Sequence, residues 1–267
     1  MTRIAALLSK EVRELRGNPG IFVPAFFTAA IAIALPFAVA VVLPYATGER
    51  LSDSADMQIA LQLYRSQPWT RVLEPEAAIQ ASIFQQFLVL LVLAPVAASM
   101  SIAAYSIIGE KQARTLEPLL ATPITTVELL TAKVLGSFLP SLLLSLACFA
   151  LYIAGVAAFA RPGAFLVLLS PRSLGILLLL GPLASLTALQ LAVCVSSRVN
   201  DTRSAQQLAA LVVLPIAGLL VAQMTGSLTL TMTLILAIAA VLALINLGLM
   251  VLAVTLFDRE SILTRWK

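Results

Sequence analysis

The residues able to do chemistry gather in one stretch, residues 104–138, where charged side chains alternate with helix-start signals. Glu110 and Arg114 stand four residues apart, in the order that favours an ion pair along a helix. Thr125 and Glu128 have the spacing of a capping box. The stretch therefore predicts a short helix, a break and a new helix.

Between these two signals lies a group of leucines that we call the leucine knob: Leu116, Leu119 and Leu120. It is followed by Thr122-Pro123, a capping residue with proline at a first helical position. A plain connector needs neither caps nor exposed leucines, so the stretch predicts a docking surface for another protein.

The sequence gives little support for catalysis or metal binding by this chain. The chain has no histidine, which removes the commonest general base and metal ligand. It has no G-x-x-x-x-G-K-[ST] phosphate loop, so it cannot hydrolyse ATP by that route. Cys148 and Cys194 lie in different apolar runs and are interpreted as packing residues. We expect no catalytic residue, metal or cofactor in this chain.

Composition defines the setting. Sixty per cent of the 267 residues are hydrophobic and only 11% are charged, with a mean hydropathy of +1.01. These values predict an all-α integral membrane protein, because lipid removes the need for a charged surface. The pI of 9.4 fits short basic loops better than nucleic-acid binding. Six spans are predicted at about 21–43, 82–105, 134–159, 173–195, 206–223 and 229–256, with a fifth–sixth pair that is either a hairpin or partly re-entrant.

Loop charge sets the orientation. Twelve basic residues fall on the side of both termini: Arg3, Lys10, Arg13, Arg16, Lys111, Arg114, Lys133, Arg198, Arg203, Arg259, Arg265 and Lys267. Only Arg50, Arg65, Arg71, Arg161 and Arg172 fall on the other side. The positive-inside rule therefore predicts cytoplasmic termini, and a cytoplasmic loop at residues 105–133.

Residues 1–20 predict a helix lying in the headgroup plane. Its apolar face carries Ile4, Leu7, Leu8, Val12 and Leu15. Its polar face carries the bases Arg3, Lys10, Arg13 and Arg16, which suit acidic lipid. Asn18-Pro19-Gly20 then breaks the helix before the first span.

Residues 44–81 predict a small extracytoplasmic cap with two helix signals and no independent domain. The first is the spacing of Met57, Leu61 and Tyr64, and the second is Glu74-Pro75. Trp69 suits an interfacial anchor.

No Asp, Glu, Lys or Arg falls in the middle of a span, which disfavours an ion-coupled carrier.

The prolines within spans fit either packing geometry or hinges. Ser137, Ser141 and Ser145 share one face of the third span and fit either close packing or a polar path. The loop SSRVNDTRSAQQ, from Ser196, is either a solvated turn or an aid to docking beside the 105–133 loop.

The run GEKQARTLEPLLATPITTVELLTAK resembles the hallmark segment of type 2 ABC-transporter permeases. The resemblance extends to the KEVRELRGNP helix, the order of six spans and the SSRVNDTRSAQQLAALVVLP stretch, and so covers nearly the whole chain.

This resemblance implies a single permease domain, residues 1–267, of an ATP-driven exporter in a prokaryotic inner membrane. Two permease subunits pair, as a homo- or heterodimer, and each docks a separate cytoplasmic ATPase that binds ATP and Mg. Docking uses a coupling helix between spans 2 and 3. The docking residues would be Glu110, Lys111, Arg114, Thr115, Leu116, Glu117, Leu119, Leu120, Thr122 and Pro123.

Two other readings stay open: a secondary transporter or channel that works without ATP, and a membrane scaffold that recruits a cytoplasmic protein through the leucine knob. The substrate is not encoded in any residue pattern of this chain. Nucleic acid is not an expected partner.

Overall fold

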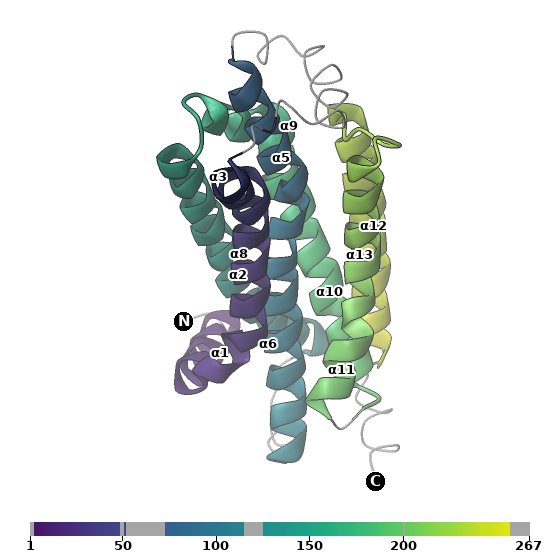
Figure 1. The fold of residues 1–267 in the computed structure, drawn as a ribbon. Helices are drawn as coiled ribbons and strands as arrows, with labels where there is room; N and C mark the ends of the chain where they lie inside the picture. Colours follow the sequence, from purple (N-terminus) through teal and green to yellow (C-terminus); the bar gives the residue numbers. More distant parts are fainter. Residues whose placement is uncertain (1–2, 49–50, 52–72, 115–124, 200, 257–267) are drawn as a thin grey trace.

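The computed structural model describes residues 3–48, 51, 73–114, 125–199 and 201–256, and the described part forms a bundle of long helices (Figure 1). Within these described residues, six helical segments are long and apolar enough to cross a membrane: Pro19–Thr47, Pro75–Gln112, Val127–Phe159, Pro171–Ser196, Thr202–Met224 and Met232–Leu256. The six predicted spans are confirmed. Several run further than predicted, because polar residues at the span ends continue the helices past the apolar run.

Most spans contain more than one helix. The first consists of η1 (Pro19–Phe22), α2 (Val23–Phe37), the π-helix η2 (Ala38–Val42) and α3 (Leu43–Thr47). The second is α5 (Pro75–Leu91) and α6 (Leu93–Gln112), and the third is α8 (Thr126–Phe159). The fourth is α9 (Pro171–Gly175), the π-helix η6 (Ile176–Leu180) and α10 (Gly181–Ser196), preceded by η5 (Ala164–Leu169). The last two are α11 (Thr202–Ala209) with η7 (Ala210–Val212) and α12 (Val213–Met224), then α13 (Met232–Leu256).

The bundle has two distinct ends (Figure 1). Helix α1 (Arg3–Gly17) lies across one of them, together with α11 and the last turns of α6, and we call this the α1 end. Helices α3 and α9 lie at the other, which we call the α3 end.

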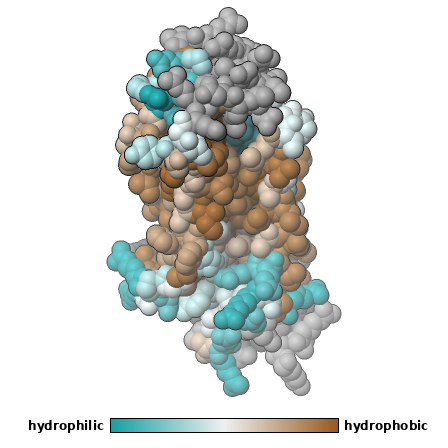
Figure 2. Space-filling model, viewed as in Figure 1, coloured by the Kyte–Doolittle hydropathy of each residue, from teal (hydrophilic) through white to brown (hydrophobic). Residues whose placement is uncertain are grey.

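The second span forms the centre of the bundle. Its helices α5 and α6 are almost wholly buried between the first, third and fourth spans. The other spans present large apolar side chains outward, among them Phe26, Leu143, Leu214 and Leu244. Figure 2 shows a broad hydrophobic belt between two polar ends. A belt of this kind is stable only in lipid, so the chain is a multi-pass membrane protein.

Neutral polar groups join the helices inside this belt. The Tyr152 hydroxyl on α8 donates to the Phe84 carbonyl on α5 at 2.9 Å. The Asn246 amide on α13 donates to the Leu183 carbonyl on α10 at 3.2 Å. In lipid an unsatisfied polar group is costly, so each such bond fixes how two helices face each other.

The serine row of the third span lies inside the protein. Ser137, Ser141 and Ser145 are buried, and the Ser141 hydroxyl donates to its own helix at Phe138. This placement supports close helix packing rather than a polar path.

At the α3 end one sequence expectation changes and one open alternative is decided. Pro75 begins α5 itself, so the Glu74-Pro75 signal starts the second span and not a separate cap helix. The fifth and sixth spans form a full hairpin, because helix continues from Thr202 to Met224 and the chain then turns at Gly226 with φ +70°. Met57, Leu61, Tyr64 and Trp69 lie outside the described residues.

Substituting Tyr152→Phe removes the hydroxyl and leaves the ring in place, so we expect a loss of about 1 kcal/mol in the free energy of unfolding. Reversible unfolding in mixed micelles measures it. The matched control is Tyr45→Phe, whose side chain is 90% exposed and whose substitution we expect to be neutral. Equal effects of the two substitutions would contradict this role for Tyr152.

Candidate functional site: an ion-pair junction at the α1 end

Charged side chains from three helices meet at the α1 end, in a group we call the junction: Lys10 and Glu11 of α1, Ser106 and Glu110 of α6, and Lys133 of α8. The Lys133 ammonium lies 2.8 Å from a Glu110 carboxylate oxygen and 3.1 Å from one of Glu11. Lys10 pairs with the other oxygen of Glu110. Two cations thus meet two anions.

The junction is buried and internally bonded. Lys133, Glu110 and Glu11 are each 5% exposed or less. The Ser106 hydroxyl donates to Glu11 at 2.8 Å and also accepts from Lys133 at 2.8 Å. Buried charges are tolerated only with close partners and further hydrogen bonds, and both are present here.

Helix α1 brings Glu11 into the junction because of its position on one helical face. Leu7, Glu11 and Leu15 recur every four residues, and all three are buried. Gly136 on α8 allows the close approach: a Cβ there would lie 2.9 Å from the Glu11 Cβ. A glycine on α8 thus lets α1 lie directly against the third span.

Lys10 is the member of the junction nearest to solvent, and it also lies 3.5 Å from Glu14. Partial burial acts to lower its pKa, but the hydrogen bond and charge of Glu110 outweigh this and raise the pKa above its usual value. A raised pKa means that its stabilising contribution is full below the unfolded-state pKa and is lost only as pH rises through the folded-state pKa. Lys10 therefore stays charged at physiological pH.

The carboxylates of Glu11, Glu14 and Glu110 lie within 4.8 Å of one another, a spacing that also suits a metal ion. Here the ammonium groups of Lys10 and Lys133 supply the positive charge among them. The junction is therefore an arrangement for holding helices together.

Both ends of the predicted docking stretch start from this junction. Helix α6 ends at Gln112, two residues after Glu110, and α8 begins seven residues before Lys133. The predicted capping box is confirmed: the Glu128 N–H donates to the Thr125 hydroxyl at 3.2 Å, and the Thr125 N–H donates to the Glu128 carboxylate at 2.8 Å.

The second loop at this end joins the same group. The Lys111 ammonium donates to the Val199 carbonyl at 3.2 Å, which links the end of α6 to the turn before α11. Asp201 caps α11 by accepting from the Ser204 N–H at 3.1 Å. The predicted closeness of the two loops is thus confirmed.

The predicted docking residues fall into three groups. Glu110 is buried beneath α1, where it pairs with Lys10 and Lys133. Arg114 is exposed beyond the end of α6, with φ +54°. Lys111 is partly buried and is held by Val199. The others lie outside the described residues: Thr115, Leu116, Glu117, Leu119, Leu120, Thr122 and Pro123.

The predicted interfacial helix is confirmed as a helix, but its apolar face is only partly buried against the protein. Leu7 and Leu15 are buried against the protein, and Val12 is exposed. Arg13 and Arg16 are exposed as predicted, whereas Lys10 turns into the junction. The side chain of Arg3 lies outside the described residues.

Sequence reasoning missed Glu11 and Ser106, and it treated Lys133 only as a loop charge. Glu11 had a visible signal, because a carboxylate falls on the leucine face of an otherwise amphipathic helix. Ser106 had none, since serine is common near span ends.

The sequence comparisons agree with this architecture. Residues 45–259 match the family described as ABC-2 family transporter protein, and this match covers most of the chain. Comparison with curated proteins gives no match. The chain belongs to the ABC-2 transporter family, and it is a membrane permease subunit of an ABC transporter.

Substituting Glu11→Gln removes one anion from the junction and leaves Lys133 with a weaker partner. Because breaking a buried ion pair costs about 3–5 kcal/mol, we expect a loss approaching that size in the free energy of unfolding. The control is Glu14→Gln, three residues further along the same helix, whose ion pair among the described residues is with the partly exposed Lys10. Its expected loss is below about 1 kcal/mol. Unfolding in mixed micelles measures both, and equal losses would contradict a buried junction.

Substituting Gly136→Val places methyl groups against Glu11, so we expect α1 to be displaced and the protein destabilised by about 1–3 kcal/mol. Gly248→Val on α13 is the control, since a Cβ at Gly248 meets nothing within 4 Å. Limited proteolysis after Arg13 and Arg16 reports displacement directly. If Gly136→Val leaves cleavage at the wild-type rate, α1 does not depend on this contact.

Proposed function

We propose that this chain is the transmembrane subunit of an ATP-driven exporter, that two such subunits form the substrate pathway, and that each docks a separate cytoplasmic ATPase through residues 105–133. ATP and Mg would bind to that partner. The role of this chain is mechanical: it receives movement at one loop and passes it to the spans.

The observation that carries the proposal is the position of the junction. It ties together α6, which precedes the 115–124 segment, α8, which follows it, and α1. A partner that displaces this segment would act on three helices at once. A loop that only connects two spans would not need three helices held together at its ends.

Charge supports a cytoplasmic position for the α1 end. Its described basic side chains are Lys10, Arg13, Arg16, Lys111, Arg114, Lys133, Arg198 and Arg203, whereas those at the α3 end are Arg161 and Arg172. The positive-inside rule then directs the junction toward the compartment that contains ATP, in a prokaryotic inner membrane. The exposed Arg13 and Arg16 would face anionic headgroups of that leaflet.

Docking through the leucine knob gives the direct test. Leu119→Asp and Leu120→Asp place a carboxylate on an apolar contact, so we expect at least about tenfold weaker co-purification with the partner ATPase, equivalent to 1.4 kcal/mol or more. Stimulation of its ATPase activity should fall in parallel. Ser227→Asp, in the exposed turn at the α3 end, is the control for an added charge.

Unchanged co-purification and activity in both leucine variants would overturn the docking proposal. Transport into vesicles that hold an ion gradient and no ATP would favour a secondary transporter. A scaffold would bind its partner in the same way, but vesicles containing both chains would show no transport on addition of ATP.

A further inference from the structure

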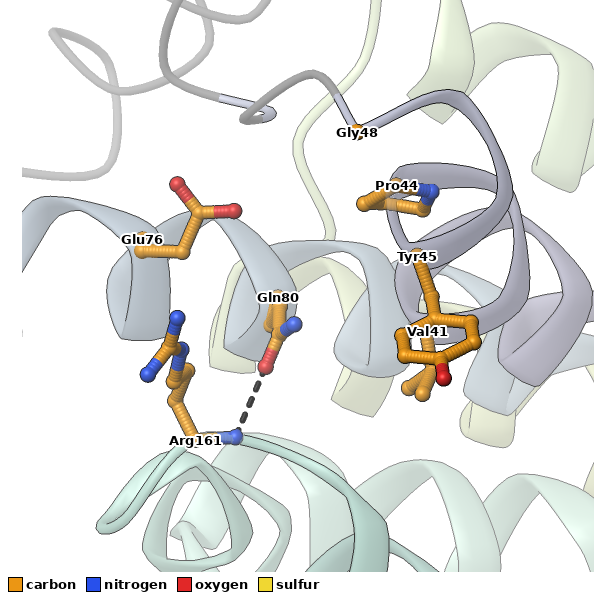
Figure 3. A pocket seen from close by; sticks show the side chains of 7 residues that line it. All are labelled: Val41, Pro44, Tyr45, Gly48, Glu76, Gln80 and Arg161. Atoms are coloured by element: carbon orange, nitrogen blue, oxygen red, sulfur yellow. Dashed lines mark hydrogen bonds between the residues drawn. The ribbon is translucent and has the colours of Figure 1, made fainter.

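A cavity of about 290 Å³ opens at the α3 end, far from the junction (Figure 3). Three segments distant in the sequence line it: the end of the first span with Val41, Pro44, Tyr45 and Gly48, the start of α5 with Glu76 and Gln80, and Arg161 after α8. Its volume lies at the lower limit for ligand sites, so it suits a small group rather than a drug-sized molecule.

The wall of this cavity is fixed by Gln80. Proline at position 44 has no N–H, so the Ala40 carbonyl lacks its usual helical donor, and the Gln80 amide donates to it at 3.0 Å. The Gln80 carbonyl accepts from the Arg161 N–H at 2.8 Å (Figure 3). Gln80 is 7% exposed, and its two bonds join the first span, α5 and the segment after α8.

Two opposite charges remain available at the cavity. One oxygen of Glu76 accepts from the Leu51 N–H at 3.2 Å, and the other is buried with no hydrogen-bond partner among the described residues. The Arg161 guanidinium lies on the same side of the cavity (Figure 3). Within the part of the chain that the structure describes, Glu76 and Arg161 do not pair with each other. A buried carboxylate oxygen without a donor is unfavourable, so the site suits a ligand that brings one.

The cavity also lies at headgroup depth. It sits where the first apolar span ends, and Tyr45 on its rim is 90% exposed, as an aromatic residue at a membrane–water boundary commonly is. A ligand reaching it from the bilayer therefore presents its polar headgroup.

We propose that this cavity binds a phosphoethanolamine zwitterion, with its phosphate at Arg161 and its ammonium at Glu76. A guanidinium suits phosphate, and an ammonium N–H supplies the donor that the Glu76 oxygen lacks. Choline has no N–H to donate, and phosphatidylglycerol leaves the Glu76 charge unpaired. The chemistry thus selects ethanolamine among common headgroups.

Native mass spectrometry of the delipidated full chain tests this with phosphatidylethanolamine, phosphatidylcholine and phosphatidylglycerol of identical acyl chains. We expect phosphatidylethanolamine to bind about tenfold more tightly than either other lipid. Glu76→Gln should remove that preference, and Arg161→Gln should weaken all three lipids. Glu74→Gln is the control, because Glu74 is exposed, outside the cavity and without a side-chain cap bond.

Competition with free phosphoethanolamine separates the two sources of this chemistry. If it displaces the lipid, the headgroup alone is recognised; if it binds while the lipids show no preference, the ligand is a soluble zwitterion. Equal binding of all three lipids together with no binding of phosphoethanolamine would overturn the proposal. This result is read on the wild-type chain, so it does not depend on folding of the variants or on the ATPase partner.

Discussion

The structure depends on a constraint at one end: charges removed from water must keep their partners. Lys133 lies between the carboxylates of Glu11 and Glu110, and Lys10 completes the balance. Moving α1, α6 or α8 separately would leave a buried charge without its partner, at a cost of about 3–5 kcal/mol. These three helix ends therefore move together or remain together, and this property supports the proposed role of the 105–133 loop in receiving movement from an ATPase.

The bundle beyond the junction is held by weaker means. Its spans contact one another through apolar side chains and through neutral hydrogen bonds, such as those of Tyr152 and Asn246. Bonds of that kind contribute about 0.6–1.7 kcal/mol each in membranes. The π-helices η2 and η6 add irregular backbone near Pro44 and Pro182. Strong ion pairs at the junction and weaker contacts between the spans are consistent with movement passing from the α1 end into the spans.

Sequence reasoning succeeded where one-dimensional pattern decides the structure. Long apolar runs defined six spans, and the Thr125 and Glu128 spacing defined the start of α8. It failed where partners come from distant segments. Glu110 has a suitable partner four residues away in Arg114, yet it pairs with Lys10 and Lys133, because burial under α1 makes the cross-helix pairs stronger. Which helix covers which charged side chain depends on the tertiary structure, and a local sequence pattern does not determine it.

The central claim is that α1 and the end of α6 move as one body. Spin labels at Arg13→Cys and Arg114→Cys, both exposed positions, measure their separation when Cys148 and Cys194 are replaced. In the proposed complex with a separate ATPase, we predict that the distance between these labels within one subunit is narrow and unchanged by ATP, while the distance from Arg114→Cys to a label at Thr225→Cys changes. A separation between α1 and α6 that shifts or broadens on addition of ATP would contradict the account.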